Sequence, residues 1–184
     1  MRVITGAARG RRLKELEGYE TRPTTDRVKE GMFNIIQFDI EGRKVLDLFA
    51  GTGQLGIEAL SRGAASAVFV EHRREAAALI RDNLKLTGLG GCAQVVCGEV
   101  LAYLSSAREK FDLIFIDPPY AANLWENTIN TISRFDILSN HGIIVSESPV
   151  EQDMPLLSPP YLLHRSYRYG KTKITTYHRE ESEL

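Results

Sequence analysis

Four consecutive residues, Asp117-Pro118-Pro119-Tyr120, place a carboxylate, a stiff backbone and an aromatic ring directly after an apolar run. Consecutive prolines restrict the backbone, so the Pro118 carbonyl points in a fixed direction beside the Asp117 carboxylate. Two such acceptors can hold both hydrogens of an amino group, while a tyrosine ring stacks on a planar base. The exocyclic amino group of a base is a poor nucleophile because its lone pair is delocalised, and this positioning favours a tetrahedral nitrogen. The segment predicts transfer to a base amine, although it would also suit a plain turn after a strand.

A glycine-rich segment lies upstream, at residues 47–56, with the sequence DLFAGTGQLG. Its glycines, Gly51, Gly53 and Gly56, have the spacing of a turn that brings backbone amides close to a nucleotide cofactor. That spacing alone fits a nicotinamide dinucleotide equally well. Asp47 favours another cofactor, because a carboxylate beside a pyrophosphate is repelled, whereas the methionine end of S-adenosyl-L-methionine carries an ammonium and a sulfonium. We therefore expect S-adenosyl-L-methionine.

Two more carboxylates follow predicted strands. Glu71 ends the second strand, where a carboxylate can hold a ribose diol through two hydrogen bonds. Glu99 follows the third strand, where it would accept from the cofactor's adenine amino group or simply favour the positive end of a helix. The residues expected around the cofactor are Asp47, Phe49, Ala50, Gly51, Thr52, Gly53, Glu71, Glu99 and Val100.

Alternating strands and helices must position these residues. Apolar runs predict strands at residues 45–50, 67–71, 94–97, 112–117 and 143–147. Helical spacing of apolar residues lies between successive runs, and this alternation is typical of a three-layer, Rossmann-like α/β fold with a mostly parallel sheet. Such a sheet binds ligands at the carboxyl ends of its strands. Segments 161–169 and 173–178 flank Gly170 and predict an antiparallel C-terminal hairpin, which brings the sheet to seven strands.

The N-terminal residues 1–23 differ from the rest, since they are short, basic and punctuated by glycines. They predict a small β-hairpin or extended arm that Pro23 closes. A helix is expected to begin near residues 24–26. No linker divides the remainder of the chain, so residues 24–184 are expected to form one compact domain.

The charge of the whole chain is −1 and does not by itself indicate nucleic acid. Its distribution is uneven, because residues 1–31 hold eight Lys or Arg against five Asp or Glu, and residues 161–179 hold five against none. These basic ends are either phosphate-binding surfaces or ordinary solvated faces. The spacing of Cys92 and Cys97 matches no zinc or redox motif, so we expect two small buried hydrophobes and no metal. No signal-peptide core or apolar run of membrane-spanning length is seen, which predicts a cytoplasmic protein.

Taken with the glycine loop, Asp-Pro-Pro-Tyr resembles the class I amino methyltransferases that act on nucleic-acid bases. More narrowly, the chain is similar to the bacterial 16S rRNA guanine-N2 methyltransferases of the small ribosomal subunit. The matching segments are RVITG at 2–6, RGRRL at 9–13, RPTTDRVKE at 22–30, VLDLFAGTG at 45–53, DPPY at 117–120 and YGKT at 169–172.

The resemblance implies the roles of the remaining residues. Asp117, Pro118 and Tyr120 would meet the target amine, and the partner would be 16S rRNA, within an assembled or partly assembled 30S subunit. The residues implied in RNA contact are Arg9, Arg11, Arg12, Arg22, Thr25, Arg27 and Lys171. Two positions depart from the pattern, because Phe49 stands where many methyltransferases have glycine and Glu99 where aspartate is usual.

Three alternatives stay open at this point. An adenine-N6 methyltransferase would use the same Asp-Pro-Pro-Tyr segment. A non-catalytic RNA-binding assembly factor would keep the fold, although the intact Asp117 and glycine loop are then unexplained. A nicotinamide oxidoreductase accounts for the glycines but not for the Asp-Pro-Pro-Tyr segment.

Overall fold

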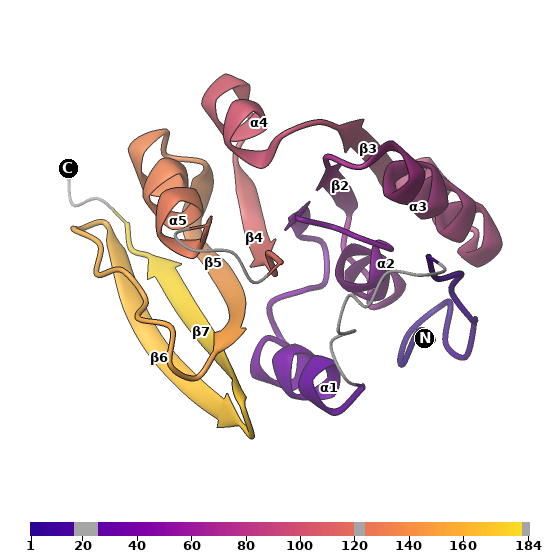
Figure 1. The fold of residues 1–184 in the computed structure, drawn as a ribbon, viewed down its shortest axis with the longest axis horizontal. Helices are drawn as coiled ribbons and strands as arrows, with labels where there is room; N and C mark the ends of the chain where they lie inside the picture. Colours follow the sequence, from indigo (N-terminus) through magenta and orange to yellow (C-terminus); the bar gives the residue numbers. More distant parts are fainter. Residues whose placement is uncertain (17–25, 120–123, 182–184) are drawn as a thin grey trace.

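The computed structural model describes residues 1–16, 26–119 and 124–181, which form a sheet with helices on both faces (Figure 1). The strands are β1 (Lys44–Leu48), β2 (Ser66–Glu71), β3 (Ala93–Cys97), β4 (Phe111–Ile116), β5 (Leu138–Pro149), β6 (Tyr161–Tyr169) and β7 (Thr172–Arg179). The helices are α1 (Asp26–Ile35), α2 (Gln54–Ser61), α3 (Arg74–Thr87), α4 (Val100–Ser106) and α5 (Leu124–Arg134), with a 3₁₀ turn, η1 (Gly90–Cys92), before β3.

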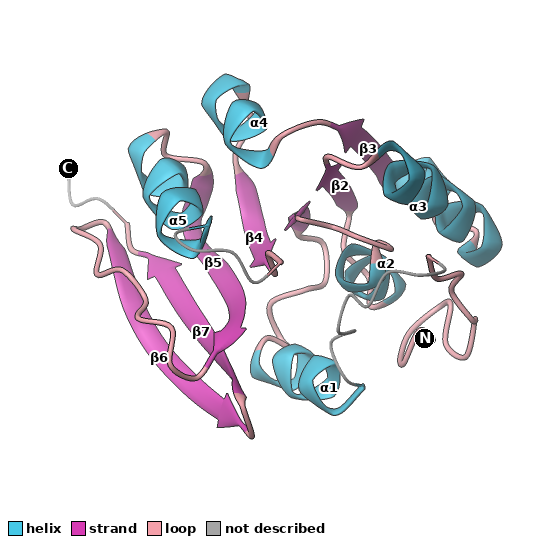
Figure 2. Cartoon of the chain, in the orientation of Figure 1, coloured by secondary structure: helices cyan, strands magenta, loops and turns pink. Residues whose placement is uncertain are grey.

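The seven strands lie in the order β3-β2-β1-β4-β5-β7-β6. The first five pair in parallel, whereas β7 is antiparallel to β5, and β6 is antiparallel to β7. This arrangement confirms the predicted Rossmann-like sheet with its antiparallel C-terminal hairpin (Figure 2). None of the described helices is both long enough and apolar enough to cross a membrane.

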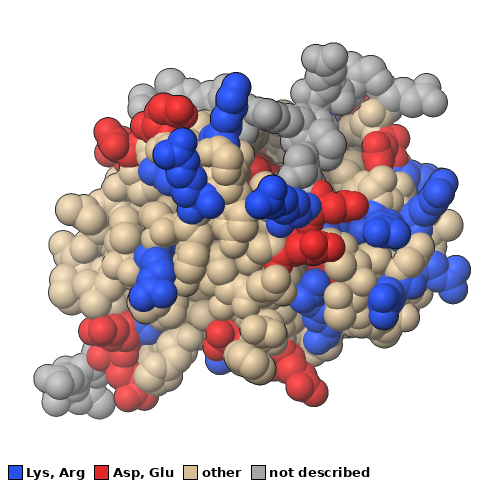
Figure 3. Space-filling model, turned by 90° about the horizontal axis from the view of Figure 1, so that it is seen from below, with Lys and Arg blue, Asp and Glu red and all other residues tan. Residues whose placement is uncertain are grey.

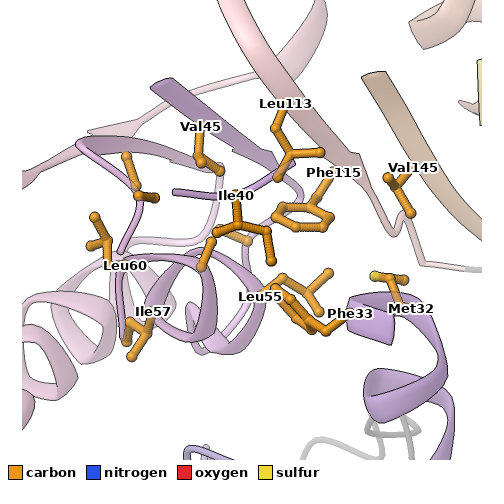
Figure 4. Close-up of a cluster of buried hydrophobic side chains, with 14 of the residues drawn as sticks. Met32, Phe33, Ile40, Val45, Leu55, Ile57, Leu60, Leu113, Phe115 and Val145 are labelled. Atoms are coloured by element: carbon orange, nitrogen blue, oxygen red, sulfur yellow. The ribbon is translucent and has the colours of Figure 1, made fainter. Parts of the chain in front are cut away.

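The sheet separates two apolar clusters, as a three-layer fold requires. One cluster joins the sheet to α1, α2 and α3, and the other joins it to α4 and α5. In the first, Phe33 of α1 packs on Phe115 of β4 with ring centroids 5.5 Å apart, and Met32 lies beside them (Figure 4). The predicted apolar face of α1 therefore packs on the sheet, close to the strand that carries Asp117.

Residues 1–16 form the described part of the N-terminal arm. An antiparallel bridge joins Arg2 to Arg12, and the amide of Val3 donates to the carbonyl of Arg11 at 2.9 Å. Gly6 has a φ of 87°, and a Cβ there would lie 1.7 Å from the Ser61 carbonyl oxygen at the end of α2. Only glycine fits this approach. The arm is a small hairpin-like loop pressed against α2.

Two sequence expectations differ from the structure. The strand expected at residues 143–147 extends over Leu138–Pro149, because pairing with both β4 and β7 continues beyond the apolar run. The expectation that both cysteines are buried is wrong, since Cys97 is exposed and Cys92 is only partly buried. The edge position of β3 explains the exposure, because no further strand covers its outer side.

Candidate active site

The ends of three neighbouring strands bring the predicted residues to one edge of the sheet. Leu48, the last residue of β1, is paired with Val70 of β2 and with Ile116 of β4. Glu71 and Asp117, which come next in their chains, consequently flank the end of β1. This edge is the side at which parallel α/β sheets bind ligands.

The loop after β1 has an unusual backbone that explains its glycines. Phe49, Gly51 and Gly53 have φ values of 60°, 56° and 80°, all in the left-handed region. Phe49 therefore holds a conformation that glycine adopts more easily, which accounts for glycine being usual at its position in the resembling enzymes. A non-glycine residue in this region is often strained for a functional reason.

The three glycines have different neighbours. A Cβ on Gly51 would meet no heavy atom closer than 4.0 Å, so the space beside this residue is open. A Cβ on Gly53 would lie 3.1 Å from Ile80 of α3, and one on Gly56 would lie 2.3 Å from the Phe69 ring. Gly56 lets α2 pack closely on β2, whereas Gly51 leaves room for a ligand against the backbone.

Asp47 is buried close to two other carboxylates, Glu71 and Asp117. Its side chain is buried and accepts a hydrogen bond from the Gly56 amide at 2.9 Å. Burial raises the pKa of Asp47 well above its ordinary value, the Gly56 hydrogen bond opposes this, and the nearby charges of Asp117 and Glu71 raise it further. This part of the edge is thus electrostatically suited to a cation.

Glu71 holds the glycine loop in place. One carboxylate oxygen accepts from the Gly51 amide at 2.9 Å, and the other accepts from the Arg73 amide at 2.9 Å and the Arg73 Nε at 3.2 Å. The carbonyl of Glu71 also accepts from the Gly98 amide at 3.0 Å, which ties the loop after β3 to the same edge. Glu71 therefore lies at the sheet edge where the ribose is predicted to bind, and its carboxylate also holds the glycine loop through the bond to Gly51.

The remaining predicted residues have contrasting surroundings. Glu99 is exposed at the start of α4 and makes no capping hydrogen bond through its side chain, whereas Val100 is buried in the α4–α5 cluster. Pro118 is buried beside Asp117. The predictions for Tyr120, Arg22 and Thr25 fall outside the described residues.

The cations expected to contact RNA lie on the surface. Arg9, Arg11, Arg12, Arg27 and Lys171 are all exposed. Within the described segments, none of these five is paired with a carboxylate.

Three cations at the opposite edge of the sheet are paired with carboxylates. Arg43 faces Asp39 at 3.9 Å, Lys44 pairs with Glu109, and Lys110 pairs with Asp136. On the face drawn in Figure 3, Lys and Arg side chains lie on both sides and at the centre, with Asp and Glu side chains among them.

Sequence reasoning missed two polar residues beside the glycine loop. Gln54 begins α2, and its buried Oε1 atom has no hydrogen-bond partner among the described residues. Asn83, on the apolar face of α3, is buried and bonds to the Thr52 carbonyl at 3.0 Å. An asparagine among Ile80 and Leu84 on a helical face was the available signal. Over residues 1–16, 26–119 and 124–181, no group of His, Cys, Asp and Glu side chains has an arrangement that could hold a metal ion.

Known proteins resemble this chain over nearly its whole length. The family model described as Conserved hypothetical protein 95 matches residues 1–178. The chain is 39% identical over 180 residues to the "Putative rRNA methyltransferase YlbH" of Bacillus subtilis (strain 168). This match covers 96% of this chain and 98% of that protein. It is 37% identical over 180 residues to Ribosomal RNA small subunit methyltransferase D of Escherichia coli (strain K12), with 98% and 90% covered.

A solved structure shows the same fold in detail. The "Putative methyltransferase yhhF from Escherichia coli" has a TM-score of 0.89 and 35% sequence identity, with 99% of each chain covered. The chain therefore belongs to the family described as Conserved hypothetical protein 95.

Proposed function

We propose, from this family membership and the carboxylate-lined edge, that the protein transfers the methyl group of S-adenosyl-L-methionine to the exocyclic N2 of a guanine in 16S rRNA. The main observation behind the proposal is that β1 and β4 are neighbours and end at the same edge of the sheet. Asp117 and Pro118, which follow β4, therefore lie next to the glycine loop that follows β1. Relatives named as ribosomal RNA methyltransferases along almost the full chain support the substrate class.

The residues present fit this cofactor. The open space beside Gly51 allows close approach to the backbone, and the Oε1 atom of Gln54, which has no partner among the described residues, offers a buried acceptor. The carboxylates of Asp47 and Glu71 make the local electrostatic potential more negative, which favours binding of the positively charged ammonium and sulfonium groups. Asp47 and Gly51 would hold the methionine end, Glu71 the ribose and Glu99 the adenine. When bound, the cofactor supplies an electrophilic methyl group on its sulfonium.

The chain's own residues then prepare the nucleophile. The Asp117 carboxylate and the Pro118 carbonyl accept one hydrogen each from the target amino group, which holds its nitrogen tetrahedral and frees the lone pair. The new N–C bond would form as the sulfur–methyl bond of the cofactor breaks, which leaves a neutral thioether. The nearby Asp117 carboxylate would stabilise the positive charge that develops on the nitrogen and would take the departing proton. The sequence alone assigns Tyr120 to stacking on the base.

RNA contact is proposed for Arg9, Arg11, Arg12, Arg27 and Lys171, which are exposed and form no ion pair with a carboxylate of the described residues. Each phosphate neutralised by such a cation releases counterions, so affinity should fall steeply with salt concentration. The described basic segments are short, which favours an assembled or partly assembled 30S subunit that adds further contacts.

Two charge-matched variants test this surface. Arg9→Gln with Arg11→Gln removes two exposed cations of the arm, and Arg108→Gln with Arg134→Gln removes two exposed cations at the other edge. The first pair should weaken rRNA binding and reduce the slope of log affinity against log salt by roughly one per lost phosphate contact. The control pair should leave the slope unchanged. Equal losses in both would refute a specific RNA-binding role for the arm.

Methyl transfer itself is tested with tritium-labelled S-adenosyl-L-methionine. Naked small-subunit rRNA and 30S particles from a strain without this protein are offered separately, and the labelled nucleoside is then identified. We expect label in N2-methylguanosine, with more transfer to the particles. Label in N6-methyladenosine would refute the guanine assignment but keep the chemistry, and equal labelling of both substrates would refute the preference for an assembled particle. An absence of label despite cofactor binding would point to a non-catalytic assembly role.

A further inference from the structure

One buried side chain joins the N-terminal arm to the glycine loop. Asn83 of α3 is 0% exposed, and its Nδ2 donates to the Thr52 carbonyl at 3.0 Å and to the Lys14 carbonyl at 3.2 Å. Its Oδ1 accepts from the Lys14 amide at 2.8 Å. A single amide therefore bonds to both backbone groups of an arm residue and to the loop that follows β1.

An amide is chemically specific for this position. Both Nδ2 hydrogens face carbonyl oxygens and Oδ1 faces an N–H group, so a carboxylate there would place acceptor against acceptor. The site is also buried, and an unmatched polar group would be strongly unfavourable. A second contact runs between the same two segments, because the Thr52 hydroxyl donates to the Met1 sulfur at 3.6 Å.

The arm also forms hydrogen bonds with α2. Ile4 and Thr5 donate their amides to Glu58 of α2, and Ala8 donates to the Ser61 hydroxyl. These bonds dock the arm on a helix without involving residues 49–53. Asn83 is thus the buried link through which the position of the arm and the conformation of the loop influence each other.

We propose that Asn83 is a positioning residue that couples cofactor binding at the glycine loop to docking of the N-terminal arm. A ligand that fixes the Thr52 carbonyl stabilises the orientation of the Asn83 amide, which in turn holds Lys14. Coupling of this kind is reciprocal, so RNA that binds the docked arm tightens cofactor binding by the same factor. This inference rests on the proposed function for the identity of the two ligands, but the coupling itself is measurable without RNA.

The test uses the full chain, with S-adenosylhomocysteine as the probe of the cofactor site. Calorimetry measures its binding, and amide hydrogen exchange over residues 2–13 measures docking of the arm. In the unmodified protein, saturation with the probe should slow exchange in the arm by about fivefold or more. In Asn83→Asp the probe should still bind, but exchange in the arm should be fast and unaffected by it.

Two further variants keep the test decisive. Asp82→Asn removes the neighbouring ion pair with the Lys14 ammonium, 3.1 Å long and exposed, without touching Thr52, so the probe should still protect the arm. Lys14→Pro removes the amide donor to Asn83 from the arm side and leaves α3 intact, so it should abolish probe-dependent protection even if Asn83→Asp fails to fold.

The proposal is overturned if Asn83→Asp or Lys14→Pro retains the full probe-dependent protection of the arm. It is also overturned if the unmodified protein binds the probe with no change in exchange of the arm. A calorimetric failure of the unmodified protein to bind S-adenosylhomocysteine would instead refute the proposed function itself, together with the coupling derived from it.

Discussion

Replacing Glu58 by leucine should destabilise the protein more than any ordinary surface change. The Glu58 and Lys29 side chains are both 0% exposed, with Nζ and Oε2 3.8 Å apart, and Glu58 also accepts from the Ile4 and Thr5 amides at 2.8 and 3.0 Å. Removing one partner of a buried ion pair leaves an uncompensated charge and typically destabilises by about 3–5 kcal/mol. The two arm amides lose their acceptor as well.

Urea denaturation at pH 7 measures this loss. With a slope of about 2 kcal/mol/M, a loss of 4 kcal/mol lowers the midpoint by about 2 M. Glu75→Leu, an exposed change on α3, is the control and should alter the free energy of unfolding by less than about 0.5 kcal/mol. Lys29→Met combined with Glu58→Leu removes the orphaned charge of Lys29 and should recover at least about 2 kcal/mol, although Arg62, whose Nε lies 2.9 Å from Glu58 Oε1, still loses its partner.

The pH dependence gives an independent check. Burial lowers the pKa of Lys29, and the negative charge of Glu58 opposes this. The Glu58→Leu substitution removes that charge, so the pKa of Lys29 should fall further. A lysine whose folded pKa lies below its unfolded value of about 10.4 makes stability rise with pH between the two values, because the unfolded chain binds more protons. The stability gap between Glu58→Leu and the unmodified protein should therefore narrow from pH 7 to pH 9.5. A loss below about 1 kcal/mol, or no recovery in the double variant, would refute the reasoning.

Three further changes have distinct expected outcomes. Asp117→Asn should reduce methyl transfer by at least about 100-fold while S-adenosylhomocysteine affinity, measured by calorimetry, changes little; normal turnover would contradict the proposed role of the carboxylate. Gly56→Ala should destabilise by about 1–3 kcal/mol in urea because the new Cβ would lie 2.3 Å from the Phe69 ring, whereas Gly90→Ala, which meets nothing within 4 Å, should be nearly neutral. Although burial tends to raise the pKa of Asp136, hydrogen bonds from nearby cations and a tyrosine hold it well below its ordinary value. The resulting stability is present above pH about 4 and is lost as pH falls through the lowered pKa, so melting temperatures of Asp136→Asn and the unmodified protein should converge in acid.

The sequence predicted the alternation of elements well because the strands are parallel and covered on both faces. Such strands appear as continuous apolar runs, as in β4, which is expected to end at residue 117 and is observed to end at Ile116. The full length of β5 could not be predicted in the same way. Polar residues lie on both sides of its apolar run. Pairing with distant residues, such as Leu138 with Phe111 of β4 and Ser148 with Lys173 of β7, extends the strand.

Residues at strand ends could be singled out from the sequence more easily than residues within helices. Asp47, Glu71 and Asp117 are recognisable because each carboxylate lies within, at the end of or directly after an apolar run, which points to the ligand-binding edge. Lys29 and Asn83 instead interrupt apolar helical faces, and their partners lie far away in sequence. Periodicity identifies such residues as anomalies, but only the folded chain shows which groups satisfy them.

The same buried polar residues explain why the short arm can take part in function. Apolar contact of Val3, Ala8 and Leu13 with the core stabilises the arm but would tolerate small shifts along the helices. Hydrogen bonds to Glu58 and Asn83 require one register, because a shift of one residue would leave buried polar groups without partners. These two anchors lie on the helices that flank the glycine loop. The docked arm is therefore fixed relative to the predicted cofactor site, which is a geometric condition for the RNA contact that we propose for its exposed arginines.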